Sequence, residues 1–173
     1  PEGSEVGNQM QLAAEVGRLC LQKCNRSKVV IIAPTVPIVR QHYDVAKNLP
    51  ELRCKFFLGS VEVDMWEREQ WDEHVMYNDV LIITPQLFLD ALDARKVNIS
   101  SFCAVIVDEC QHCSGRHPLA KIFAEHVSGL REHVRVLGIS GRLVKPKVKG
   151  SAEKDQVIRL SLIHISEPTR PSS

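Results

Sequence analysis

The run Ala104-Val-Ile-Val-Asp-Glu-Cys-Gln-His112 is the strongest indication of the fold of this chain. Its β-branched first half is typical of a strand buried on both faces of a parallel sheet. Asp108 and Glu109 follow directly, so we expect them at the carboxyl end of that strand, where open α/β sheets bind ligands. Two adjacent acids could hold a hydrated Mg²⁺ and polarise a water for attack on a phosphoryl group. The alternative is a strand end with solvated acids.

The composition limits the classes of protein that the chain can belong to. Its 173 residues correspond to about one domain. The sequence has 22 basic and 21 acidic side chains, so its charge is nearly balanced. Nucleic-acid binding would therefore have to come from a local groove. The six cysteines lie mostly in apolar periodic segments, which favours reduced thiols and a cytoplasmic protein. No apolar run approaches the ~20 residues of a membrane span, so no membrane partner is expected. The start at Pro1, without Met, suggests a fragment of a longer protein.

Short apolar runs alternate with longer amphipathic segments along the chain. Strands are expected at 28–33, 52–58, 80–84, 104–108 and 134–139, and helices at 9–24, 37–49, 64–77, 85–94 and 118–127. This alternation is typical of βαβ units and predicts an α/β fold, with a parallel sheet and helices on both faces. Residues 1–8 are small and polar, and we expect a flexible loop there.

The turns after successive strands resemble, in order, the motifs of superfamily 2 helicases. The segments are 33–41 (APTVPIVRQ) for motif Ia, Thr84-Pro85-Gln86 for motif Ib, Asp108-Glu109-Cys110-Gln111 for motif II and 137–141 (LGISG), with Ser140 and Gly141, for motif III. Four such segments in order, each in its strand–turn context, form a specific pattern. The resemblance implies a three-layer RecA-like lobe of the P-loop NTPase type over residues 1–142.

The same resemblance implies cofactors and contacts. ATP and Mg²⁺ would be the cofactors, with Asp108 holding the metal through water and Glu109 acting as general base. The residues implied in contacts with an RNA backbone are Thr35, Arg40, Gln41, Thr84, Pro85 and Gln86. Hydroxyls, amides and Arg contact phosphates without reading bases. The alternative for the threonines is ordinary helix capping.

Two further segments narrow the resemblance to Dicer-type endoribonucleases. Trp66-Glu-Arg-Glu-Gln-Trp71 resembles the paired-tryptophan segment of their helicase module. Residues 108–118 resemble a run shared by Dicer and the RIG-I-like RNA sensors. The resemblance implies double-stranded RNA, a second RecA-like lobe and ribonuclease III domains of the same full-length chain, and a double-stranded-RNA-binding accessory protein as partners. Hydrophobic packing of the tryptophans against the sheet is compatible with either family.

The phosphate-binding loop departs from the family pattern, which ends in Gly-Lys-Thr. The first residues offer Gly3, Ser4, Val6 and Gly7, with Val6 at the lysine position and Gly7 at the hydroxyl position. Glu5 would also place a negative charge beside a polyphosphate. This copy is therefore expected to hydrolyse ATP poorly or not at all. Three alternatives stay open: an active ATP-dependent translocase lobe, an RNA sensor, and a scaffold that docks RNA or a partner.

Two expectations concern the ends of the chain. The sequence lacks the family's first strand. In the family that strand lies beside the acid-bearing strand, so we expect its loss to leave unpaired backbone groups there. Residues 143–159 are expected to be a linker. Within residues 160–173, the run LSLIHISEPTR resembles a translated adapter of transposase-based sequencing libraries, so this tail is excluded from fold reasoning.

Overall fold

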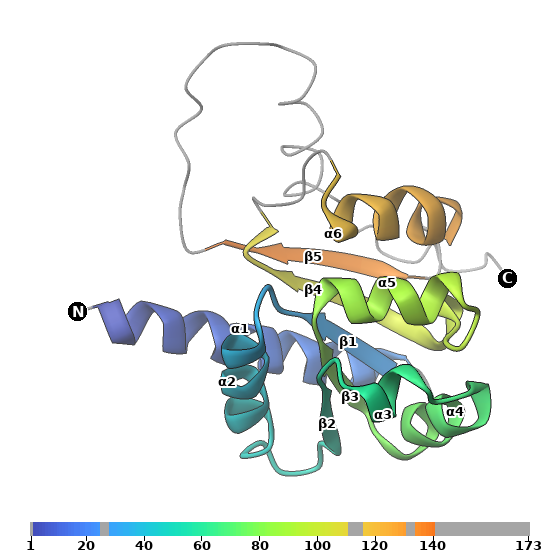
Figure 1. The fold of residues 1–173 in the computed structure, drawn as a ribbon. Coiled ribbons are helices and arrows are strands. Elements are labelled where there is room, and N and C mark those ends of the chain that lie inside the picture. Colours follow the sequence, from blue (N-terminus) through green and yellow to red (C-terminus); the bar gives the residue numbers. More distant parts are fainter. Residues whose placement is uncertain (1, 25–27, 111–115, 131–133, 141–173) are drawn as a thin grey trace, which may run out of the picture.

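A computed structural model describes residues 2–24, 28–110, 116–130 and 134–140 of the chain (Figure 1). The helices are α1 (Glu2–Lys23), α2 (Val36–Ala46), α3 (Val61–Asp64), α4 (Arg68–Tyr77), α5 (Pro85–Asp93) and α6 (Pro118–Lys121), and the strands are β1 (Lys28–Ile32), β2 (Cys54–Phe57), β3 (Val80–Ile83), β4 (Phe102–Asp108) and β5 (Arg135–Ile139). Short 3₁₀ turns at Ile99–Ser101 and Ser128–Leu130 and a π-helical turn at Ile122–Val127 complete the described elements.

The strands form one parallel sheet in the order β2-β3-β1-β4-β5. Side chains alternate between its faces, because successive residues of a strand point to opposite sides. Val30 and Ile32 of β1 join a core with α4, α5 and α6, whereas Val29 and Ile31 join a second core with α1 and α2. Figure 1 shows α5 and α6 on the opposite side of the sheet from α1 and α2. The predicted three-layer α/β architecture is confirmed.

The neighbours of the acid-bearing strand differ from our expectation. β4 pairs with β1 on one edge and with β5 on the other, so the main-chain groups of this strand meet partners on both sides. The expected gap beside it, left by a missing first strand, is therefore wrong. All seven residues of β4 are buried, which agrees with a central strand whose both faces are covered.

Some boundaries also differ. The structure places residues 2–8 at the start of α1, not in the expected flexible loop. The helix expected at 64–77 is interrupted between α3 and α4, where the Glu67 backbone N–H donates to Gln70 Oε1 at 2.9 Å. This bond belongs to a capping box, which begins a new helix. The helix expected at 118–127 is α6 followed by the π-helical turn.

The paired tryptophans pack in the core on the α4–α5 face. Trp71 is 2% exposed, and its ring centroid lies 5.1 Å from that of Phe57 and 5.6 Å from that of Trp66. Trp66 is half-buried and meets the Phe57 ring edge-on at 6.0 Å. Such tilted and edge-to-face pairs add to the stability that burial alone gives. The packing role expected for both residues is confirmed.

The described cysteines Cys20, Cys24, Cys54, Cys103 and Cys110 are free thiols. Burial raises the pKa of Cys54 to about 11 and that of Cys103 to about 12, so both thiols stay protonated at neutral pH. Among the described helices, none is long and apolar enough to cross a membrane.

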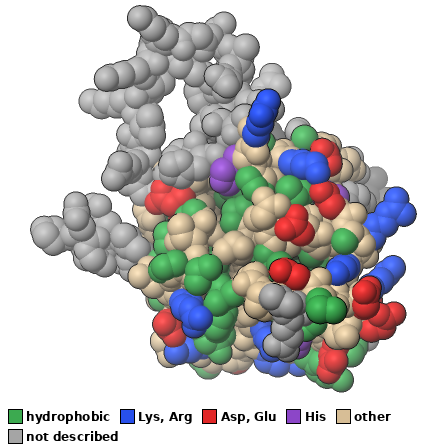
Figure 2. All heavy atoms as spheres, in the orientation of Figure 1, with side chains coloured by type: hydrophobic (Ala, Val, Ile, Leu, Met, Phe, Trp, Pro, Cys, Tyr) green, Lys and Arg blue, Asp and Glu red, His purple; other side chains and the backbone are tan. Residues whose placement is uncertain are grey.

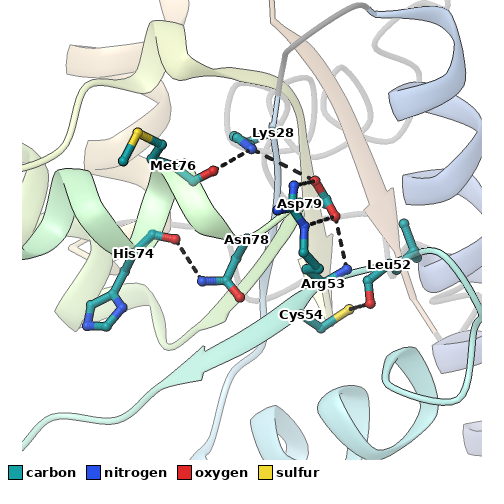
Figure 3. Close-up of polar contacts among 8 residues, drawn as sticks. All are labelled: Lys28, Leu52, Arg53, Cys54, His74, Met76, Asn78 and Asp79. Carbon is teal, nitrogen blue, oxygen red and sulfur yellow. Dashed lines mark hydrogen bonds and ion pairs between the residues drawn. The ribbon is translucent and has the colours of Figure 1, made fainter.

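A group of charged residues joins the amino ends of three strands (Figure 3). Arg53, just before β2, donates from Nε to Asp79 Oδ2 at 3.1 Å and from Nη2 to Asp79 Oδ1 at 3.0 Å. Lys28, at the start of β1, lies 3.8 Å from Asp79 Oδ1 and also donates to the Met76 carbonyl oxygen at 3.1 Å. Asp79 directly precedes β3. A single carboxylate therefore fixes the starts of β1, β2 and β3 relative to one another.

This carboxylate should make stability depend on pH in the acid range. Partial burial would raise the pKa of Asp79, but hydrogen bonds from Arg53 and the charges of Arg53 and Lys28 outweigh it and lower this pKa below its ordinary value of 3.8. A lowered acid pKa stabilises the fold above 3.8, and that contribution is lost as the pH falls through the folded-state value. We expect Asp79→Asn to lower the free energy of unfolding near neutral pH. The further decrease of this free energy in acid should be smaller than in the wild type.

Urea unfolding of the wild type and variant, from neutral pH to below pH 3, measures this dependence. Asp72→Asn is the matched control, because Asp72 lies 3.4 Å from Arg68 in an exposed ion pair, and such pairs contribute little. Parallel acid profiles for the wild type and Asp79→Asn would show that Asp79 has no such role.

Candidate functional site

The motif residues meet at the carboxyl edge of the sheet. Ile32 of β1 is in register with Ile83 of β3 on one side and with Val107 of β4 on the other. Asp108 in turn is in register with Ile139 of β5. Because these strands are parallel, the residues that follow them lie along one edge. Those predicted site residues are Thr84 after β3, Thr35 after β1, Asp108 at the end of β4 and Ser140 after β5.

Asp108 is held by two hydrogen bonds. It is 5% exposed, its Oδ2 lies 2.8 Å from His42 Nε2, and its Oδ1 accepts the Glu109 backbone N–H at 2.9 Å. A buried carboxylate is costly unless it is hydrogen-bonded, and both of its oxygens have partners here. Each oxygen keeps a further lone pair that could face a water. Its chemistry and its place at the edge therefore fit a hydrated Mg²⁺.

Glu109 turns the chain immediately after the strand. Its φ of 55° lies in the left-handed region, which costs a residue other than glycine roughly 1 kcal/mol. The hydrogen bond from its own N–H to Asp108 helps to hold this conformation. Cys110 follows, half-buried, and burial raises the pKa of its thiol, so it stays protonated.

Two threonines stand at helix starts without capping them. Thr35 and Thr84 are the N-cap residues of α2 and α5, yet neither side chain makes a capping hydrogen bond. The helix-capping alternative for their hydroxyls is therefore wrong. Both helices have proline in the first turn, where the missing N–H does no harm. Two helix N-termini with available hydroxyls thus lie at the ends of neighbouring strands, and helix N-termini attract phosphates.

The remaining predicted RNA contacts differ in accessibility. Arg40 and Gln41 are exposed on α2, and the Arg40 guanidinium carbon lies 5.3 Å from the centroid of the Phe56 ring. Gln86 is exposed and donates to Asp90 Oδ1 at 2.7 Å. Pro85 is buried at the start of α5, so its ring serves packing and presents no surface to a ligand.

The predicted phosphate loop is helical here. Gly3, Ser4, Val6 and Gly7 all fall within α1, and the described backbone forms no loop that could wrap a phosphate. These residues do not fit the polyphosphate of ATP, since the sequence has no Lys before Lys23 to neutralise it. Gly141, the linker at 143–159 and the tail at 160–173 lie outside the described residues.

His42 is the site residue that sequence reasoning missed. It lies on the buried stripe of α2 with Val39 and Ala46, at helical spacing, and it is 1% exposed. A polar ring on an otherwise apolar stripe was the available signal. Its partner is 66 residues away, however, and no local pattern predicts that contact.

Comparison with known proteins identifies the family of the chain. A profile of DEAD/DEAH box helicases matches residues 9–147, so the chain belongs to that family. It is also 33% identical over 116 residues to Endoribonuclease Dicer homolog 3 of Arabidopsis thaliana, covering 67% of this chain and 7% of that protein. For Dicer homolog 2 of the same plant the identity is 34% over 123 residues, covering 68% and 9%. For Dicer-like protein 2 of Cryphonectria parasitica it is 33% over 132 residues, covering 75% and 9%.

Within the family, these matches support a helicase lobe of the Dicer type, as the motifs predict. The chain spans less than a tenth of the length of these three Dicer relatives. Among solved structures, the helicase domain of Pyrococcus furiosus Hef superposes with a TM-score of 0.62 at 20% identity, covering 80% of this chain and 28% of that one. This similarity confirms the RecA-like fold.

Proposed function

We propose that this lobe works within a longer Dicer-type protein in the binding and processing of double-stranded RNA, with little or no ATP hydrolysis of its own. The observation that carries the proposal is the carboxyl edge of the sheet. Along it lie two threonines at helix N-termini, whose side chains make no capping hydrogen bond, and a hydrogen-bonded acid. Threonine hydroxyls and helix N-termini suit a phosphate backbone more than a base edge. We propose that RNA cleavage belongs to ribonuclease III domains elsewhere in the full-length protein, which we expect to be cytoplasmic. The other proposed partners are a second RecA-like lobe and a double-stranded-RNA-binding accessory protein.

RNA binding by this lobe is proposed to depend on local contacts, not on overall charge. The net charge is +1, and the face drawn in Figure 2 has basic and acidic side chains intermixed. Arg40 follows Thr35 by little more than one helical turn and is exposed. Its guanidinium is partly pre-ordered over Phe56, so less freedom is lost when it binds a phosphate.

Replacing Arg40 with alanine in the full-length protein should weaken double-stranded RNA binding by a similar factor for unrelated RNA sequences. Loss of one phosphate contact should lower the slope of log affinity against log salt by about 1. Fluorescence anisotropy over a salt series measures both effects. Arg68→Ala, which removes an exposed arginine from α4, is the control and should match the wild type. A sequence-dependent loss, or an unchanged slope, would contradict a backbone contact by Arg40.

The proposed low ATPase activity rests on the residues at the start of α1, which lack the lysine of the family pattern. Asp108 and Glu109 retain the acids for Mg²⁺ and for a general base, but Val6 occupies the position of the lysine that meets the transferring phosphate. Electrostatic contacts of that kind contribute several kcal/mol to catalysis, on the order of 10²–10³ in rate for one donor. ATP turnover by the full-length protein, with and without double-stranded RNA, tests this, and turnover at ordinary helicase rates would refute it.

A second candidate function is a docking scaffold for RNA or for a partner protein, without catalysis by this lobe. The substitution of Val6 and Gly7 for the lysine and hydroxyl residues favours it over an active translocase. Asp108→Asn separates the scaffold from an active translocase. A scaffold retains RNA affinity when Asp108 is replaced by asparagine, whereas a translocase loses RNA-stimulated turnover.

A further inference from the structure

We propose that His42 is a positioning residue for Asp108, which holds the carboxylate in the one orientation that meets a hydrated divalent cation. This inference rests on the proposed function, in which Asp108 binds Mg²⁺ through water. The contact joins α2 to the end of β4, with 2.8 Å between His42 Nε2 and Asp108 Oδ2. Both side chains are buried, at 1% and 5% exposure.

The direction of this hydrogen bond follows from the chemistry of the two groups. An ionised carboxylate can only accept, so His42 Nε2 carries the hydrogen and donates it. The other oxygen accepts the Glu109 N–H at 2.9 Å. Two donors from different elements therefore restrain rotation of the carboxylate about the Cβ–Cγ bond of Asp108. The lone pairs that remain then point in fixed directions, which is how outer partners orient the ligands of a metal.

Packing alone does not account for this pair. Val39 and Ala46, one turn before and after His42 on the same stripe of α2, are apolar. Removing two polar groups from water costs free energy that an apolar pair of the same shape would not cost. The sequence nevertheless places both groups here, at the sheet edge where the other motif residues gather. A role in holding the acid explains this placement.

The test measures binding of Mn²⁺, a paramagnetic substitute for Mg²⁺, to the full-length protein by electron paramagnetic resonance. The relevant quantity is the part of the binding that Asp108→Asn removes. His42→Leu, which cannot donate, should weaken this part about 10-fold, as losses of outer partners do. His42→Gln, whose amide N–H is placed much like Nε2, should stay within about 3-fold of the wild type.

The matched control is His126→Leu. His126 Nε2 lies 2.8 Å from Asp93 Oδ1, the same distance, but this pair is near the surface on other elements. Asp93 and His126 form a cluster with Glu125 that could itself attract a cation. Counting only the binding that Asp108→Asn removes excludes that cluster, so the control should match the wild type.

A double-mutant cycle separates positioning from simple support of the fold. If His42 acts through Asp108, His42→Leu should change Mn²⁺ binding in the wild type but not in the Asp108→Asn background. If His42→Leu lowers the Tm and leaves Mn²⁺ affinity unchanged, the inference is wrong and the proposed function stands. If His42→Leu does not fold, His42→Asn, whose shorter amide falls short of Oδ2, replaces it with the same expected loss. If the wild type shows no binding that depends on Asp108, the metal site of the proposed function is wrong, and the inference fails with it.

Discussion

Replacing Trp71 with alanine should lower the free energy of unfolding by about 3–5 kcal/mol, the usual cost of removing a large aromatic side chain from a core. Trp71 is among the largest fully buried side chains of the described residues, and it contacts both Phe57 of β2 and Trp66. Its removal leaves a cavity between α4 and the sheet that these rings cannot fill without leaving their own contacts. Urea denaturation followed by circular dichroism measures the change.

Trp66→Ala is the comparison that makes this result specific. Trp66 is half-buried, so it loses less apolar area and leaves a gap that water can enter. We expect its cost to be clearly smaller than that of Trp71→Ala. Should Trp71→Ala prevent folding altogether, Trp71→Phe keeps a ring in place and should show an intermediate cost. Equal costs for Trp66 and Trp71 would contradict the packing described for β2 and α4.

Restoring the family's phosphate loop should raise ATP turnover by a factor on the order of 10²–10³, the size of effect expected from one well-placed electrostatic donor. The triple variant is Glu5→Gly, Val6→Lys and Gly7→Thr. It removes a repelling charge, supplies the lysine, and adds a hydroxyl for Mg²⁺. Glycine at position 5 also disfavours helix by about 1 kcal/mol relative to alanine. The first turn of α1 could then open into a loop.

Phosphate release by the full-length protein, with and without double-stranded RNA, measures the gain. Adding Asp108→Asn to the triple variant should abolish this gain, because the acid proposed to hold the metal is then neutral. Val6→Ala alone is the control for any change at this position and should leave turnover at the level of the wild type. No gain in the triple variant would show that something other than the loop residues limits hydrolysis.

The local patterns of the sequence predict the elements well. The β-branched runs at 28–33, 80–84 and 104–108 correspond to β1, β3 and β4, because burial on both faces demands continuous apolar runs. The placement of Asp108 at a strand end follows from the same pattern. The break between α3 and α4 was not predicted, because the capping box there begins with Glu67, which is not among the usual N-cap residues.

Other features depend on contacts between distant segments. The strand order, which places β4 between β1 and β5, is set by packing of the whole sheet and not by any one strand. The pairing of His42 with Asp108 is of the same kind. The first residues of α1 show a different difficulty: Gly3 and Gly7 favour a loop on propensity, which is a weak guide inside a longer helix.

The Asp79 network has a practical use, because it lies at the amino ends of the strands and the motif residues lie at the opposite edge. Met76 and Tyr77, next to that network, are 59% and 57% exposed. A fluorophore or surface tether attached at Tyr77 would therefore lie at the end of the sheet opposite to the carboxyl edge. Single-molecule recordings with such a label could follow the proposed binding of RNA, because the label is attached far from the motif residues.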